Sequence, residues 1–214
     1  MKKLLMTKKI GFVFLGVISL RSGTAAFAAV ENTRIAGVQG KAVIVRGGQS
    51  MPAEVGAQIQ DEDILKTEAD GVLDVSIDNQ AGGRILSSSE SSIVSTDAGQ
   101  MRVKVMTGDI LLNVEKLPRG SSFKVETPTA IASVRGTQFS CHVDNRITGN
   151  PVASFAVRED AVDVSILGTG ETITVAEGRA LDIPKNLTGP LATRSAFGIE
   201  LANLEQSSTI HTCS

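Results

Sequence analysis

The sequence predicts an all-β domain of stacked β-hairpins, arranged as a sandwich or as a solenoid-like β domain. Short runs of alternating apolar and polar residues recur along the chain, and Gly-containing turn signals separate them about every 8–12 residues. No helical periodicity occurs before about residue 188, which argues against a sheet built of βαβ units. The composition agrees, since the chain has 21 Gly and neither Trp nor Tyr.

Seven runs have the period of two that places apolar side chains on one face of a strand and polar side chains on the other. They are Leu73–Ile77, Met101–Val105, Ile110–Val114, Phe123–Val125, Phe139–Val143, Val162–Ile166 and Ile173–Val175. Turns are predicted at Gly-containing segments between the strands, among them 46–48, 81–83, 107–109, 119–120, 168–170 and 177–178. Each run is expected to form a half-buried strand that ends at a turn.

Residues 1–28 have the three parts of a secretory signal peptide. Four lysines lie among the first nine residues, an apolar run of 11 residues extends from Ile10 to Leu20, and Ala26-Phe27-Ala28 places small residues before the expected cut. A spanning helix needs roughly 20 apolar residues, so we expect cleavage after Ala28 and no stable membrane insertion of the mature chain. The predicted location is the periplasm, with secretion as the alternative.

Cleavage would leave an acidic protein of one domain. The leader carries five basic residues and no acidic one, so the remaining chain has 16 basic and 23 acidic residues and a net charge of −7. An acidic chain without basic clusters is repelled by phosphate backbones, which argues against a nucleic-acid partner. We expect a β domain over residues 29–186, because this length is sufficient for one hydrophobic core.

Residues 187–214 have a different character and are predicted to form a C-terminal tail or a short helix. Phe197, Leu201 and Leu204 are spaced at i, i+4 and i+7, which is the pattern of one apolar face of a helix. Such a helix would dock on the β domain. The alternative is a mobile tail or a partner-binding segment.

Several segments together resemble the FecR-type domain family. The resemblance extends over about residues 35–184 and includes Gly108-Asp-Ile-Leu-Leu-Asn-Val114 and Phe123-Lys-Val-Glu-Thr-Pro128. Its most specific part is Thr127-Pro128 followed by Val134-Arg135-Gly136-Thr137 and Phe139. We refer to Phe123–Phe139 as the signature segment.

The resemblance implies a periplasmic all-β module of the kind that relays signals from outer-membrane receptors to extracytoplasmic sigma factors. The relay proteins carry a cytoplasmic segment and a spanning helix before the β domain, whereas nine residues precede the apolar run here. This difference predicts a free-standing periplasmic FecR-like protein without the sigma-regulator segment.

The residue types of the signature segment favour a structural role. Pro128 lacks an N–H and restricts Thr127 to extended geometry, so the two residues would end a strand. Gly136 permits a close approach that a Cβ would block. Arg135 would bind loop carbonyls or a carboxylate such as Glu126, and the functional alternative is an anion-binding arginine.

Catalytic motifs are missing from the sequence. It has no nucleophile elbow, no zinc-protease helix motif and no Gly-rich phosphate or dinucleotide loop, and it contains only 2 His. The acidic clusters Asp61-Glu62-Asp63 and Glu159-Asp160 could form a general acid pair or a cation site, but neither has calcium-loop spacing, so solvated turn carboxylates are favoured. We therefore predict no enzyme activity, no catalytic residue and no cofactor.

Two cysteines and two histidines allow three alternatives. In an oxidising compartment Cys141 and Cys213 would form a disulfide that closes a loop of about 70 residues and adds roughly 4 kcal/mol. Both cysteines could instead remain unpaired. A metal site is disfavoured because strand alternation places Cys141 and His142 on opposite faces.

These observations leave three functional hypotheses. The first is a non-enzymatic periplasmic binding or scaffold module that engages an envelope protein. The second is an accessory in transmembrane signalling. The third is a cell-wall or polysaccharide binder, which is weakened because Phe123, Phe139, Phe155 and Phe197 are the only aromatic residues after the leader.

Overall fold

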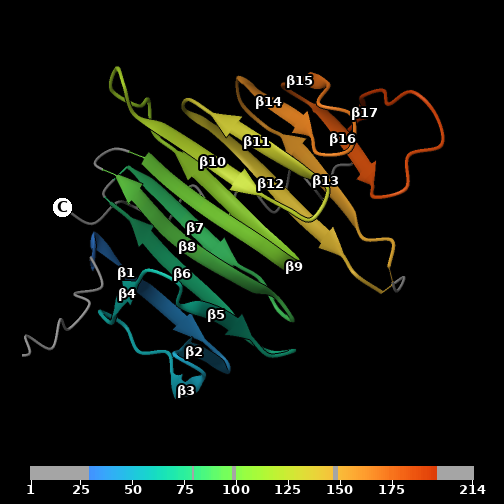
Figure 1. Cartoon of the computed structure of the whole chain (residues 1–214). Coiled ribbons are helices and arrows are strands. Elements are labelled where there is room, and N and C mark those ends of the chain that lie inside the picture. The colour runs from blue at the N-terminus through green and yellow to red at the C-terminus, as the bar shows by residue number, and fades with distance from the viewer. Residues whose placement is uncertain (1–28, 79, 98–99, 147–148, 197–214) are drawn as a thin grey trace, which may run out of the picture.

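The computed structural model describes residues 29–78, 80–97, 100–146 and 149–196 (Figure 1). These residues form 17 strands and no helix, which confirms the all-β prediction. No helix long and apolar enough to span a membrane occurs among them. The predicted signal peptide and the predicted C-terminal helix lie outside the described residues.

The strands form two sheets that face each other and share one central strand, β9 (Gln100–Val114). Sheet A contains, in spatial order, β4 (Gln58–Gln60), β1 (Ala29–Gln39), β6 (Val72–Ile77), β7 (Ala81–Ile85), the second half of β9, β12 (Thr137–Asp144), β13 (Val152–Val157), β16 (Arg179–Pro184) and β17 (Arg194–Ser195). Sheet B contains β3 (Gln49–Pro52), β2 (Ala42–Arg46), β5 (Ile64–Thr67), β8 (Glu90–Asp97), the first half of β9, β10 (Ser122–Glu126), β11 (Ala130–Val134), β14 (Ala161–Ile166) and β15 (Thr172–Ala176).

The chain advances along this sandwich by changing sheets after every one or two strands. Hairpins β2–β3, β10–β11 and β14–β15 belong to sheet B, and hairpins β6–β7 and β12–β13 belong to sheet A. The colours in Figure 1 accordingly run from blue at one end of the sandwich to red at the other. Among the described pairings only β9 with β10 is parallel.

Strand β9 corrects one turn prediction. Residues 107–109 do not reverse the chain, because β9 pairs with β8 as far as Thr107 and with β12 from Gly108 onward. The strand crosses from sheet B to sheet A at Gly108, whose φ of 84° is accessible to glycine at little cost. An added Cβ there would lie 2.6 Å from the Cα of Ser89, so the crossing also requires a residue without a side chain.

A second predicted turn is a strand. Residues 81–83 begin β7, and Gly83 packs against the side chains of Val75 and Leu112 in the interior. The Gly-containing segments at 47–48, 119–120 and 168–169 do form turns, as the sequence predicts.

Alternation along the strands fills the space between the sheets with one hydrophobic core. In β14 the side chains of Val162, Val164 and Ile166 are buried, whereas Ala161 and Asp163 are exposed. Phe123, Phe139 and Phe155 are among the largest fully buried side chains. Burying such side chains contributes roughly 1.5–3 kcal/mol each relative to exposure, so the core is the main source of stability.

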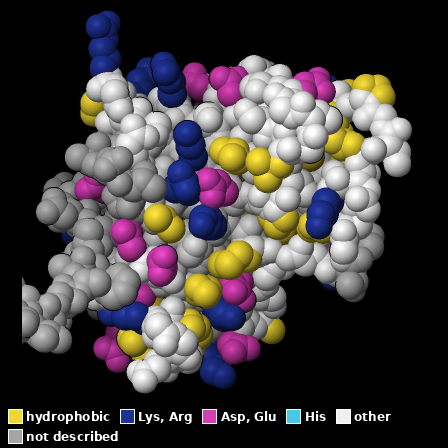
Figure 2. All heavy atoms as spheres, in the orientation of Figure 1, with side chains coloured by type: hydrophobic (Ala, Val, Ile, Leu, Met, Phe, Trp, Pro, Cys, Tyr) yellow, Lys and Arg dark blue, Asp and Glu magenta, His cyan; other side chains and the backbone are white. Residues whose placement is uncertain are grey.

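In the orientation of Figure 1, the surface carries basic and acidic side chains that are interspersed, and its hydrophobic side chains are scattered among polar atoms (Figure 2). Two cross-strand ion pairs of sheet B illustrate this mixture. Lys66 contacts Glu90 at 2.8 Å, and Arg102 contacts Glu126 at 3.0 Å.

Candidate functional site

The signature segment forms β10, β11 and the start of β12, and it carries the chain from sheet B to sheet A. Its apolar residues Phe123, Val134 and Phe139 are buried in the core. Two corners separate its strands, one at Thr127–Thr129 and one at Arg135–Gly136.

The first corner is closed by Thr127. Its backbone N–H donates to the Ala130 carbonyl at 2.9 Å, and its hydroxyl oxygen accepts from the Ala130 N–H at 3.0 Å. Pro128 lies at the position of this turn that needs no N–H donor and that suits the φ of proline. The corner therefore places Pro128 and Thr129 at one end of the sandwich.

The second corner depends on Gly136 and Thr137. Gly136 has a φ of 115°, and an added Cβ would lie 2.9 Å from the Cα of Lys116. The Thr137 hydroxyl donates to the backbone carbonyl of Glu159, which joins the corner to the segment between β13 and β14. The chain can cross between the sheets here only with a glycine.

Arg135 is exposed and lies away from the carboxylate considered in the sequence. Glu126 instead contacts Arg102, and Arg135 has no hydrogen-bond or ion-pair partner among the described residues. Arg135 lines a small hollow of about 200 Å³ together with residues 117–121. The guanidinium is therefore available on the surface.

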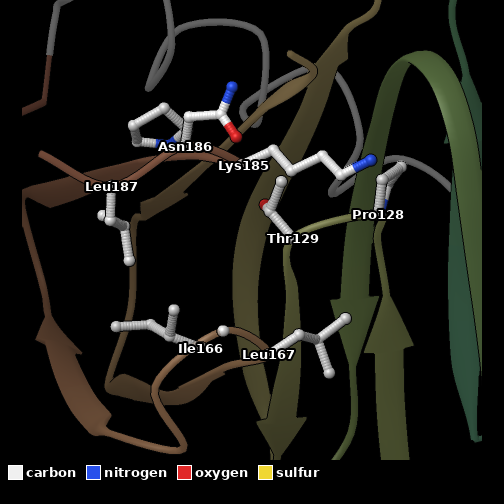
Figure 3. Close-up of a pocket in the computed structure, with 9 residues that line it drawn as sticks. Pro128, Thr129, Ile166, Leu167, Lys185, Asn186 and Leu187 are labelled. Atoms are coloured by element: carbon white, nitrogen blue, oxygen red, sulfur yellow. The ribbon is translucent and has the colours of Figure 1, made fainter. Parts of the chain in front are cut away.

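A larger hollow of about 310 Å³ lies at the first corner and is open to solvent (Figure 3). We call it the end pocket, and its lining comes from three segments: Pro128–Thr129, Ile166–Gly168 and Pro184–Leu187. In Figure 3, Ile166 and Leu187 point toward each other across the hollow, and Lys185 extends toward Pro128. Leu167 is 55% exposed at the tip of the β14–β15 hairpin, which is unusual for a large hydrophobic side chain here.

The same hairpin continues from the end pocket into an open sheet edge. β15 has β14 as its only strand partner among the described residues. The Ile166 N–H donates to the Glu171 carbonyl at 2.8 Å, and the antiparallel ladder alternates from that pair onward. The backbone N–H and C=O of Thr174 therefore point toward the free edge, where they can pair with another strand.

A row of polar side chains crosses the outer face of sheet A. His142 lies opposite Asp109 on one side and Ser154 on the other, and Ser154 lies opposite Asp182. His142 Nδ1 is 2.8 Å from Asp109 Oδ1, and Arg194 donates to both oxygens of Asp182 at 2.6 and 3.0 Å.

The pKa values of His142 and Asp182 are both shifted in the direction that favours the charged form. The hydrogen bond to Asp109 raises the pKa of His142 above its usual value, although partial burial opposes the rise. Burial pushes the pKa of Asp182 upward, but hydrogen bonds from Arg194 and Ser154 outweigh it and leave the pKa lowered. The charged forms of His142 and Asp182 are thus stabilised by neighbouring side chains on the same face of sheet A.

Cys141 and His142 do lie on opposite faces of β12. The Cys141 side chain is fully buried in the core, and this burial is the main reason that the pKa of its thiol is raised well above the usual range. No group of three or more potential ligands for a metal ion occurs among the residues that the structure describes. The predicted pairing with Cys213 lies outside the described residues.

Sequence reasoning found the signature segment but not the end pocket or the polar row. Both arise from long-range strand pairings, since the row joins residues 109, 142, 154 and 182. The exposed Leu167 beside Gly168-Thr-Gly170 was the available signal for the pocket. An apolar residue next to a hairpin turn is a candidate contact residue.

Comparison with known proteins identifies a matching protein family and a protein of similar fold. The model of the family described as FecR protein matches residues 63–181, which is more than half of the chain. Two crystal structures of a protein from Parabacteroides distasonis ATCC 8503, described as an anti-sigma factor, have a similar fold, with TM-scores of 0.56 and 0.55. Each shows 13% sequence identity over 67% of this chain, which spans 64% of the length of that protein. A search of curated proteins found no match.

Proposed function

The chain belongs to the FecR protein family, and on this basis we propose that it is a non-enzymatic regulatory module that engages another protein of the cell envelope during signalling. The family match extends from the start of β5 into β16, so it includes the central strand β9 and both corners of the signature segment. The likeness in fold to a protein described as an anti-sigma factor supports the same class of function.

The observation that carries the docking mode is the open edge of β15 beside the end pocket. A partner segment in an extended conformation would add to this edge, with backbone hydrogen bonds supplying affinity and a neighbouring pocket supplying specificity. The end pocket and the exposed Leu167 lie at the tip of the same hairpin and offer an apolar contact. We therefore assign the partner-binding surface to β15 and the end pocket.

Polysaccharide binding is the less favoured function. Phe123, Phe139 and Phe155 are all buried in the core and offer no ring to a sugar.

The predicted leader fits a periplasmic location. N-terminal sequencing of the exported protein would test this location, because the mature chain is expected to start at Ala29.

The docking mode can be tested by in-cell crosslinking of the tagged protein, with co-captured proteins identified by mass spectrometry. Thr174→Pro removes the N–H that points toward the free edge, whereas Thr174→Ala keeps this N–H and loses the side-chain hydrogen bond to Asp163. We expect the proline variant to lose the captured partner and the alanine variant to retain it. Thermal melts of both variants would verify that they are folded.

A second pair of variants tests the end pocket. Leu167→Asp places a charge at the hairpin tip. Val55→Asp is a matched control because Val55, at 66%, is the other large exposed hydrophobic residue in the part of the chain that the structure describes. Loss of the partner with Leu167→Asp alone is the expected result. Equal capture by all four variants would contradict docking at this surface, and no capture by the wild type would contradict protein engagement itself.

A further inference from the structure

Among the residues whose burial the structure describes, three buried hydrophobic side chains lie outside the core. Leu111, Ala156 and Ala180 are 3%, 2% and 0% exposed, yet none belongs to the cluster that fills the space between the sheets. Leu111 lies opposite Ser140, Ser140 lies opposite Ala156, and Ala156 lies opposite Ala180. These four residues form a continuous row, which we call the outer strip.

Strand alternation places the outer strip on the outer face of sheet A. Both chain neighbours of Leu111, Ile110 and Leu112, belong to the core and point inward. The same holds for Phe155 and Val157 around Ala156. A leucine that points away from the interior is buried only where neighbouring side chains of the same face, such as Arg84 opposite Leu111, or another part of the protein cover it.

Two polar side chains beside the outer strip point to the same conclusion. Ser76 and Gln138 are 2% and 8% exposed, and Ser76 Oγ and Gln138 Oε1 have no hydrogen-bond partner among the described residues. Both residues lie on the outer face, in a row that runs from Ser76 through Gly82 and Asn113 to Gln138. A buried polar atom without a partner is costly, so this face is built to receive hydrogen bonds as well as apolar contacts.

We propose that residues 197–214 of this chain bind on the outer strip. The described chain reaches this face at its last residue, because the Ala196 N–H donates to the Gly178 carbonyl beside β17, the edge strand of sheet A. The apolar face that the spacing of Phe197, Leu201 and Leu204 predicts would complement Leu111, Ala156 and Ala180. Backbone or side-chain donors of the same segment would satisfy Gln138 Oε1.

The segment is long enough to reach the whole strip. The path from β17 to β9 crosses four strand intervals of about 4.8 Å, or roughly 19 Å. A helix over 196–206 would span about 16 Å, and the remaining eight residues would add up to about 3.3 Å each. An occupant tethered at the edge of the sheet also has a high effective concentration at the strip.

This inference is independent of the proposed docking at β15, which lies in sheet B. It assigns the outer face of sheet A to the protein's own C-terminal segment. A partner that binds this face would have to displace that segment first.

Photocrosslinking in the intact mature chain, residues 29–214, tests the proposal. The photoreactive residue p-benzoylphenylalanine replaces Leu201 on the apolar face of the predicted helix, and in a matched control it replaces Asn203 on the opposite face. We expect Leu201 to give crosslinks within one chain to peptides that contain Leu111, Ala156 or Ala180, and Asn203 to give few. Crosslinks to sheet B, crosslinks only between two chains, or equal yields from both positions would overturn the proposal.

Variants of the strip provide the second measurement. Leu111→Lys should lower the yield of the Leu201 crosslink at least about tenfold, whereas Ile131→Lys on the outer face of sheet B should leave it unchanged. Ala156→Glu serves if Leu111→Lys fails to fold, which circular dichroism would reveal. An unchanged yield in a folded variant of the strip would overturn the proposal.

Discussion

The outer faces of the two sheets differ in what they bury. Sheet A carries the outer strip, with Leu111 inaccessible and with buried polar atoms of Ser76 and Gln138. Sheet B carries ion pairs such as Arg102–Glu126, whose side chains remain partly exposed. The side chains on the two outer faces of the sandwich therefore differ in how far they are exposed to solvent.

This difference shows that burial has two origins in a β-sandwich. The core is buried by the packing of the two sheets, and it follows directly from alternation along each strand. The outer strip is buried although its residues point away from that core, and the proposed binding of residues 197–214 would account for this burial. Matched substitutions on the two outer faces can distinguish these two causes of burial, because they should lower the free energy of unfolding by different amounts.

The largest effect is expected from the apolar residue of each face. Leu111→Asn should lower the free energy of unfolding by about 2–4 kcal/mol, because it replaces a buried leucine by an amide without partners. Ile131→Asn on sheet B should cost less than about 1 kcal/mol, since Ile131 is only partly buried. Urea denaturation of both variants measures the difference, and equal midpoints would mean that the faces are equally exposed.

Truncation after Ala196 sharpens this prediction. If residues 197–214 cover the strip, Leu111→Asn in the truncated chain should cost no more than Ile131→Asn does. A cost that stays at its full value after truncation would identify a different cover.

A smaller effect is expected from the ion pairs. Arg84 donates to both oxygens of Asp74 at 2.7 and 3.0 Å on sheet A, and both side chains are less exposed than those of Arg102 and Glu126. Asp74→Asn should cost about 1–2 kcal/mol because it replaces the carboxylate that accepts two hydrogen bonds from a mostly buried guanidinium by a neutral amide. Glu126→Gln should cost less than about 0.5 kcal/mol in the same denaturation experiment, and a larger loss from Glu126→Gln would reverse the comparison.

The smallest effect is expected from pH. The pKa of His142 is raised in the folded protein, so its pairing with Asp109 stabilises the fold fully below the ordinary histidine pKa and less as pH rises through the raised value. The stability lost on Asp109→Asn should be greater at pH 5.5 than at pH 8.5, by less than about 1 kcal/mol because both side chains are substantially exposed. NMR titration should show the pKa of His142 falling in this variant, and an unchanged titration would contradict the pairing.

The sequence predicted most of the core and little of the surface. Val162, Val164 and Ile166 alternate with less hydrophobic residues, so their inward orientation follows from the pattern alone. The outer strip instead interrupts alternation, as in Ile110-Leu111-Leu112 and Phe155-Ala156-Val157, and these interruptions were the available signal for a second apolar surface.

The pairing of the strands could not be predicted from the sequence, and the reason is physical. Apolar periodicity shows which face of a strand is buried but not which strand lies beside it. Residues 107–109 resemble a turn locally, yet they carry β9 between the sheets because its neighbours β8 and β12 come from distant parts of the chain. The candidate surfaces at β15 and on sheet A depend on such pairings.

The position of β9 links the two halves of the chain mechanically. Four strands lie on each side of it in both sheets, with those from residues 29–97 on one side and those from residues 122–195 on the other. Detaching either half would remove most of the backbone hydrogen bonds along one edge of a 15-residue strand. The two halves should therefore unfold together as one cooperative unit, despite a layout in which each hairpin contacts mainly its neighbours.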